Sequence, residues 1–188
     1  MPAVLTKLVD RVPELLKGVE ELTAHDVLVG IPSAKTARKG EMITNASLAY
    51  IHEYGSPAQN IPARPFLIPG VKAIRKEALA MLRQGALDVM QGKATASVVL
   101  NKVGILARNS VVEHITDPDP PFAPLAPSTV RARLRRTQAG RRKLRGIKAD
   151  AAQAGVSMSM ALTQWGEGNL QPLIDTGQLR ASITYVVR

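Results

Sequence analysis

Apolar residues recur at helical spacing through the first part of the chain. They predict an amphipathic helix over residues 3–22, within an N-terminal element that we place at residues 1–24. Pro13 lies inside this pattern and predicts a kink or a division of the helix, because its ring removes an amide donor and crowds the preceding turn. The apolar positions are Val4, Leu5, Leu8, Val9, Val12, Leu15, Leu16, Val19 and Leu22.

Two short segments have the composition of strands. Residues 26–31 are rich in β-branched side chains and stop at Pro32, and residues 182–187 alternate in the manner of a strand. We expect these two strands to pair, which brings distant parts of the chain into one small sheet. Residues 33–43 are rich in basic side chains and predict a mobile loop.

Helical patterns fill much of the middle of the chain. Residues 44–54 predict a short helix with Thr44 or Asn45 as its N-cap. Residues 69–92 and 93–115 show apolar side chains at helical spacing and predict two longer helices that pack as a hairpin.

Prolines predict two non-helical stretches. In residues 61–67 each residue before a proline is pushed out of the helical region, so this segment is expected to be extended. Residues 116–127 contain five prolines, which exclude regular structure and predict a stiff connector. Ser128 follows and is expected to cap a short helix that carries a run of basic residues.

These elements predict an α+β fold, in which a small antiparallel sheet packs against two or three long helices, with extended loops or arms. We assign residues 25–136 and 171–188 to the core domain and residues 137–170 to a basic, Gly- and Ala-rich insertion or arm. Weak apolar periodicity over residues 149–172 predicts a lobe that orders only in an assembly.

Length and composition narrow the class of protein. The chain has 188 residues, room for one domain with arms, and 45% hydrophobic residues, enough for a core. Aromatic residues make up 3%, which leaves few surfaces for stacking bases, and the absence of cysteine removes disulfides and thiolate metal sites. The start of the chain lacks the apolar run of a signal peptide, and the longest apolar runs fall far short of the ~20 residues that cross a bilayer. We therefore expect no membrane association.

The net charge of +10 is concentrated in one segment, residues 131–148. Without it, 16 basic residues face 15 acidic ones. Such a patch meets DNA phosphates or an acidic protein face, and the alternative is a solvated arm. No zinc-finger spacing or basic zipper accompanies it, so any DNA contact is expected at the backbone and to weaken with salt. The basic residues are Arg131, Arg133, Arg135, Arg136, Arg141, Arg142, Lys143, Arg145 and Lys148.

Tests for catalytic chemistry are negative. His25, His52 and His114 are dispersed without metal-ligand spacing, and no nucleophile elbow, phosphate-binding loop or dinucleotide motif is present. We therefore expect a protein that is not an enzyme and has no metal or cofactor. One alternative stays open, a hydrolase or nuclease whose site is assembled from His52, Glu53 and Asp175.

Three segments carry a resemblance to a known family. Residues 49–56 (AYIHEYGS) followed by residues 61–69 (IPARPFLIP) resemble the "HEfG…IPARPFLrP" motif of tailed-bacteriophage virion morphogenesis proteins, which act in tail completion at the neck. Residues 121–133 are similar to the family's "W.PLsp.T…R" segment, with Phe122 where Trp is commoner. Residues 172–183 are similar to its C-terminal "pLidTG.Lr.Si" motif.

The resemblance singles out two groups of residues. The first is a docking motif with a preset extended course, whose apolar anchors Phe66 and Leu67 enter either the domain's own core or a subunit interface. The second is a C-terminal motif in which Asp175 and Thr176 are expected to cap a turn or helix. The docking motif is Ile61, Pro62, Arg64, Pro65, Phe66 and Leu67, and the C-terminal motif is Asp175, Thr176, Gly177 and Leu179.

What the resemblance implies is a structural protein of the virion neck, made in the host cytoplasm. It would form a ring, with a hexamer favoured and a dodecamer as the alternative, that completes the tail and joins it to the DNA-filled head. Its partners would be the head connector or adaptor and the tail tube or terminator, with genomic DNA possible in the lumen. The alternative function is DNA binding through residues 131–148.

Overall fold

The computed structural model describes residues 12–32 and 43–188. In chain order its elements are α1 (Val12–Ala24), β1 (Val27–Gly30), α2 (Asn45–Tyr54), the 3-10 helix η2 (Pro57–Gln59), α3 (Leu67–Ala73), α4 (Arg75–Met90), α5 (Ala96–Thr116), α6 (Pro127–Arg135), α7 (Gln138–Ala154), α8 (Met158–Asn169), α9 (Gln178–Ser182) and β2 (Thr184–Val187). Helix accounts for 68% of the described residues.

The fold is mostly α-helical, so the predicted α+β class, with a sheet packed against two or three long helices, is wrong. Within the described residues there are nine α-helices and one sheet of two short strands. The difference lies largely in residues 149–172, the predicted weakly ordered lobe, most of which belong to α7 and α8. Thr137 and Ser157 cap these helices by accepting hydrogen bonds from the amides of Gly140 and Met160. Capping marks helix starts where apolar periodicity is weak.

Strands β1 and β2 pair antiparallel, with Val27 opposite Val187 and Gly30 opposite Thr184. This confirms the two predicted strands and their pairing. Both strands pack on α5. A Cβ on Gly104 of α5 would clash with the Tyr185 ring, so the absence of a side chain there lets β2 lie directly against the helix.

Helices α4 and α5 pack side by side as the predicted hairpin. The single helix predicted over residues 69–92 is instead divided at Ile74 into α3 and α4. Helix α3 lies close against α5 at Gly70. A Cβ there would come within 2.8 Å of the Val111 Cα, so the absence of a side chain permits this approach. Ser110 of α5 donates a hydrogen bond of 2.7 Å to the Gly70 carbonyl and fixes this contact.

The apolar core is made of two separate clusters. The first lies between α3, α5 and the C-terminal segment and contains Phe66, Val111, Ile115, Leu173, Leu179 and Ile183. The second lies between α6, α7 and α8 and contains Leu125, Val130, Leu134, Ile147 and Leu162. Helices α6, α7 and α8 therefore pack on one another around a core of their own.

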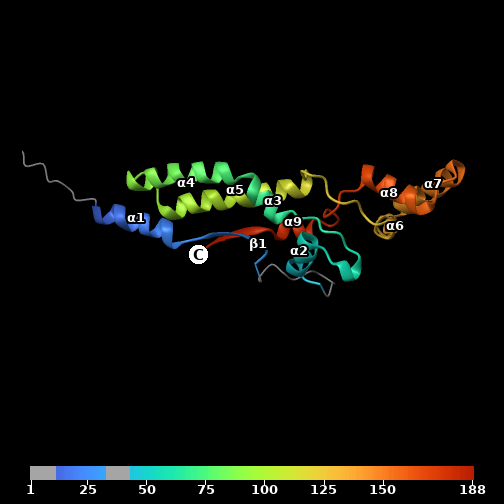
Figure 1. Cartoon of the computed structure of the whole chain (residues 1–188), viewed down its shortest axis with the longest axis horizontal. Helices are drawn as coiled ribbons and strands as arrows, with labels where there is room; N and C mark the ends of the chain where they lie inside the picture. The colour runs from blue at the N-terminus through green and yellow to red at the C-terminus, as the bar shows by residue number, and fades with distance from the viewer. Residues whose placement is uncertain (1–11, 33–42) are drawn as a thin grey trace, which may run out of the picture.

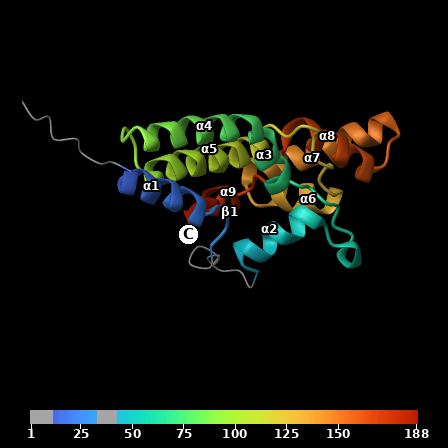
Figure 2. The same cartoon turned by 60° about the vertical axis from the view of Figure 1, so that its left-hand side comes forward.

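Figures 1 and 2 show these three helices at the opposite end of an elongated molecule from α1. Two segments without helix or strand link them to the rest: residues 117–126 between α5 and α6, and residues 170–177 between α8 and α9. We call them the first and second connectors. The first coincides with the predicted proline-rich connector, whose irregular structure is confirmed.

Prolines stand in the first turns of two helices, α6 and α1. Ala126 is the N-cap of α6 and Pro127 occupies its first turn, so the prediction of Ser128 as the cap is wrong. Proline suits this position because its missing amide has no helical acceptor and its φ angle is already helical. Pro13 stands in the first turn of α1, and its predicted effect on residues 3–11 lies outside the described residues. So does most of the predicted basic loop over residues 33–43.

Candidate functional site

The "HE" motif positions α3 through a buried carboxylate. Helix α2 starts at the predicted cap Thr44, which accepts a hydrogen bond from the Ser47 amide. Near the end of α2, Glu53 is only 7% exposed. Its Oε2 accepts hydrogen bonds from the amides of Phe66 at 2.8 Å and Leu67 at 2.9 Å, and its Oε1 accepts one from Ile68 at 3.0 Å. Glu53 therefore satisfies amides at the start of α3, where a helix has no acceptors of its own.

The turn between α2 and the docking motif is tight. Gly55 has φ 75°, and a Cβ there would lie 2.9 Å from the Ala63 amide nitrogen, so glycine is required on both counts. The Ser56 and Ile61 backbones form an isolated antiparallel bridge around η2. The Arg64 amide then donates to the His52 carbonyl at 2.6 Å, which returns the chain to α2.

Arg64 holds the first connector. Its side chain is buried, with the residue 5% exposed. Its Nε donates to the Ala123 carbonyl at 2.7 Å and its Nη2 to the Pro124 carbonyl at 2.6 Å. The two donors of the guanidinium thus match two successive carbonyls of a segment that belongs to neither a helix nor a sheet.

Arg133 of α6 holds the second connector in the same way. Its Nη1 donates to the carbonyls of Gln171 at 3.1 Å and Ile174 at 2.9 Å. Its Nε lies 3.6 Å from Asp175 Oδ1, and Arg136 Nη1 lies 2.5 Å from Asp175 Oδ2. We call Arg64, Arg133, Arg136 and Asp175 the arginine joint.

The charges in the arginine joint are unbalanced. Burial lowers the pKa of Arg64, and the positive charge of Arg133 lowers it further. Burial also lowers the pKa of Arg133, whereas Asp175 raises it and Arg136 lowers it. Asp175 is the carboxylate that opposes the lowering of the Arg133 pKa, and at both arginines the carbonyls satisfy guanidinium donors that burial removes from water.

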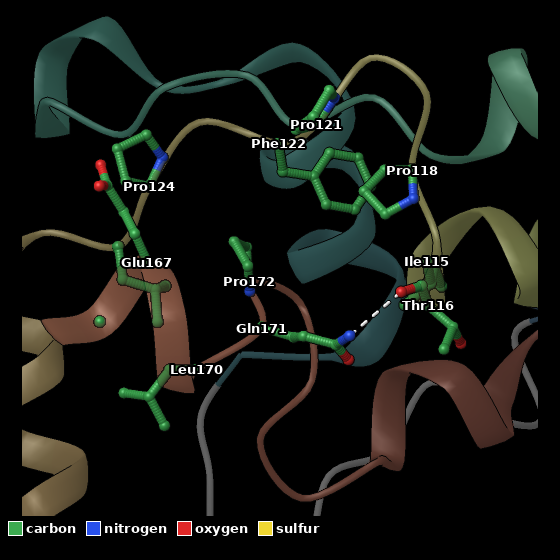
Figure 3. A pocket seen from close by; sticks show the side chains of 12 residues that line it. Ile115, Thr116, Pro118, Pro121, Phe122, Pro124, Glu167, Leu170, Gln171 and Pro172 are labelled. Carbon is green, nitrogen blue, oxygen red and sulfur yellow. Dashed lines mark hydrogen bonds between the residues drawn. The ribbon is translucent and has the colours of Figure 1, made fainter. Parts of the chain in front are cut away.

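A cavity of about 340 Å³ lies beside the joint, between the end of α5, the first connector and the end of α8. Figure 3 shows the side chains around it, and Gln171 reaches across to donate a hydrogen bond of 3.2 Å to the Thr116 carbonyl. Phe122 of the connector also makes an edge contact with His114, their ring centroids 6.0 Å apart. The lining is Ile115, Thr116, Pro118, Pro121, Phe122, Pro124, Leu125, Gly166, Glu167, Leu170, Gln171 and Pro172.

The residues predicted for docking fall into different environments. Phe66 is 1% exposed in the first apolar cluster, so this anchor enters the domain's own core. Leu67 is half-buried against the same cluster, and Ile61 is half-buried. Pro62 and Pro65 are exposed. In this chain, therefore, the motif contains a core residue, Phe66, and a residue that binds the first connector, Arg64.

In the C-terminal motif Asp175 does not cap α9 as expected, and Thr176 contacts only the amide of the first residue of this helix. Asp175 pairs with two arginines instead, and Thr176 Oγ1 accepts a long hydrogen bond of 3.5 Å from the Gln178 amide. Gly177 is the N-cap of α9 with φ 75°, and Leu179 is buried in the first cluster. The motif therefore ties the second connector to α6 through Asp175 and to the core through Leu179.

Of the nine basic residues of the run, three lie on α6 and five on α7, and Arg136 is the C-cap of α6. Arg133 and Arg136 belong to the arginine joint, and Arg141 Nη1 donates to the Arg135 carbonyl at 3.2 Å. Arg131 is half-buried on α6. The members of the run on α7 are all exposed: Arg141, Arg142, Lys143, Arg145 and Lys148.

Glu53 and Asp175, two of the three residues of the alternative catalytic site, form structural contacts in different places. The Glu53 carboxylate accepts amides of α3, while the Asp175 carboxylate pairs with Arg133 and Arg136. Among residues 12–32 and 43–188, no three acidic or histidine side chains cluster in a way that could hold a metal ion. Sequence reasoning missed the structural use of Glu53 and Arg133, whose partners lie 13 or more residues away.

Comparisons with protein-family models, with curated proteins and with solved structures gave no match to this chain. In the part of the chain that the structure describes, no helix is both long enough and apolar enough to span a bilayer.

Proposed function

We propose that this protein is a structural component of a tailed-bacteriophage neck, which acts without turnover and without a cofactor. In this role it forms a ring that completes the tail and joins it to the DNA-filled head. The proposed ring is a hexamer, with a dodecamer as the alternative. Its partners are the head connector or adaptor on one face and the tail tube or terminator on the other, in the virion and, during assembly, in the host cytoplasm.

One observation carries the proposal. The three sequence segments that resemble the neck family are far apart in the chain, yet they meet at the arginine joint. Arg64 of the first segment binds carbonyls of the second, and Arg133 of the second binds the stretch that leads into and contains the third. Motifs that serve one structural task are expected to converge in this way, since each secures the path of another.

Exposed apolar side chains support a role in assembly. On α1, Leu16 is 65% exposed, and on α2 the neighbouring rings of Tyr50 and Tyr54 are 66% and 60% exposed. Large apolar side chains gathered on a surface are typical of surfaces that pack against another protein. A ring requires two different surfaces of this kind on each subunit, because its contacts run head to tail.

The test is electron microscopy of particles made by a phage that lacks only this reading frame. We expect filled heads and separate tails, which join and become infectious when the purified full-length protein is added. The matched addition is the Arg64→Ala, Asp175→Ala variant, which opens the arginine joint and is expected to restore joining poorly. Normal joined particles in the absence of the reading frame would overturn the proposed function.

A further inference from the structure

The exposed cations of α7 form a stripe along one side of the helix. Arg141, Arg145 and Lys148 are spaced i, i+4 and i+7, which places them in line over about 10 Å of helix. Arg142 lies beside this line. The apolar side of α7, with Leu144, Ile147 and Ala151, lies roughly a quarter-turn around the helix from this line. The basic stripe borders the packed side of α7, and its three cations are exposed to solvent.

The charge balance of this stripe differs from that of the arginine joint. Within the described residues, Arg142, Arg145 and Lys148 form no ion pair, in contrast to Arg133 and Arg136. The acidic residue on α7 is Asp150, which lies about 140° around the helix axis from Arg145. Arg142, Arg145 and Lys148 are consequently available to an external anion, while Arg141 also donates a hydrogen bond to the Arg135 carbonyl.

Small residues lie to one side of the stripe, beside Arg142. A Cβ built on Gly146 would meet nothing within 4 Å, and Gly146, Ala139, Arg142 and Arg145 contribute to the lining of one open hollow. A glycine in a helix interior costs about 1 kcal/mol relative to alanine, but it allows an external group to approach the helix backbone closely.

We propose that this face of α7 binds the phosphate backbone of double-stranded DNA without regard to sequence. Arginine forks match phosphate oxygens, and the stripe has the length of a few successive phosphates. Helix α7 contains no aromatic residue on which single-stranded bases could stack. It also presents no large exposed apolar side chain, which an acidic protein partner would need as an anchor. The inference does not depend on the proposed neck role.

The test is fluorescence anisotropy of a labelled duplex of roughly 20 base pairs with the full-length protein, at several salt concentrations. We expect a dissociation constant of about 10⁻⁴–10⁻⁶ M near physiological salt that weakens steeply as salt rises. The triple variant R141Q/R145Q/K148Q is expected to bind about tenfold or more weakly, and its log–log salt slope to fall by roughly 2 to 3.

The matched control removes the same charge elsewhere. Lys72, Lys76 and Arg83 are exposed on α3 and α4, and the variant K72Q/K76Q/R83Q is expected to lose less than about twofold. The variant R141K/R145K keeps the charge and should retain most of the affinity. Circular dichroism shows whether each variant is folded.

Three outcomes would overturn the inference. The first is an equal loss in both triple variants, which indicates that net charge alone attracts DNA. The second is the absence of salt-dependent binding. The third is tighter binding of poly-glutamate than of duplex through the same three α7 residues, which assigns the stripe to an acidic protein partner.

Discussion

At the scale of single residues, Glu53 acts as a remote cap. Helix α3 is seven residues long and starts without a side-chain cap of its own, so the amides of Phe66, Leu67 and Ile68 depend on a carboxylate from α2. Short helices are marginal in water, and α3 gains its position from this contact and from its packing on α5. The acidic residue of the "HE" pair is thus a structural group in this chain.

Replacing Glu53 by Gln is expected to lower the free energy of unfolding by about 2–3 kcal/mol. The glutamine keeps one acceptor oxygen, but its amide group points donors at amides that are themselves donors, and these are left unpaired in a buried place. Urea unfolding followed by circular dichroism measures the change.

Glu113→Gln serves as the control for Glu53, because Glu113 is an exposed side chain on α5 and its substitution is expected to stay within about 0.5 kcal/mol. A loss for Glu53→Gln no larger than that of Glu113→Gln would contradict the capping role.

The sequence alone predicts part of this chemistry and not the rest. Phe66 is found from its neighbours, since an aromatic residue after prolines in an extended segment is a natural core anchor. The buried structural roles of Glu53 and Arg64 are not predicted, because an ionisable residue is expected to be exposed until its distant partners are known. The partners of Arg64 lie 59 and 60 residues further along the chain.

At the scale of elements, local signals decide which predictions succeed. The pairing of β1 with β2, helix α2 with its cap Thr44, and the α4–α5 hairpin follow from patterns within each segment. The break at Ile74 has no proline or glycine signal at the residue itself and follows from the packing of α3 on α5. Helices α7 and α8 are not predicted as such, because their apolar positions are sparse. Their caps Thr137 and Ser157 are nevertheless of residue types that favour helix N-caps.

The first connector depends on Arg64 for its path, since it has neither helix nor strand to fix it. Replacement of Arg64 by Lys keeps the charge but removes the fork, so one of the Ala123 and Pro124 carbonyls loses its donor. We expect a loss of about 2 kcal/mol in stability and faster amide exchange in residues 122–126, measured by hydrogen–deuterium exchange.

Arg75→Lys is the control for the connector, because Arg75 is exposed at the start of α4 and makes no such contact in the described structure. Exchange in residues 122–126 that stays at the parent rate in Arg64→Lys would show that Arg64 does not hold the connector.

At the scale of the whole molecule, two apolar clusters are joined by two connectors. Helices α6, α7 and α8 contact one another around Leu162, whereas α3 and α5 pack with the C-terminal segment around Val111, and α4 packs on α5. Polar links between the clusters are the arginine joint and the bond from Gln171 to Thr116, while the first connector packs Phe122 against one cluster and buries Leu125 in the other. Polar links of this kind hold a geometry without merging two cores into one cooperative unit.

Leu162→Ala tests this independence. Leu162 is fully buried in the second cluster, so its truncation is expected to cost about 2–5 kcal/mol there. Amides of α6, α7 and α8 should then exchange faster by a large factor, while amides of α5 around Val111 keep their protection. Val111→Ala, in the other cluster, should give the reverse pattern. Equal acceleration on both sides in either variant would mean that the connectors transmit unfolding, and that the arginine joint binds the two clusters into a single cooperative body.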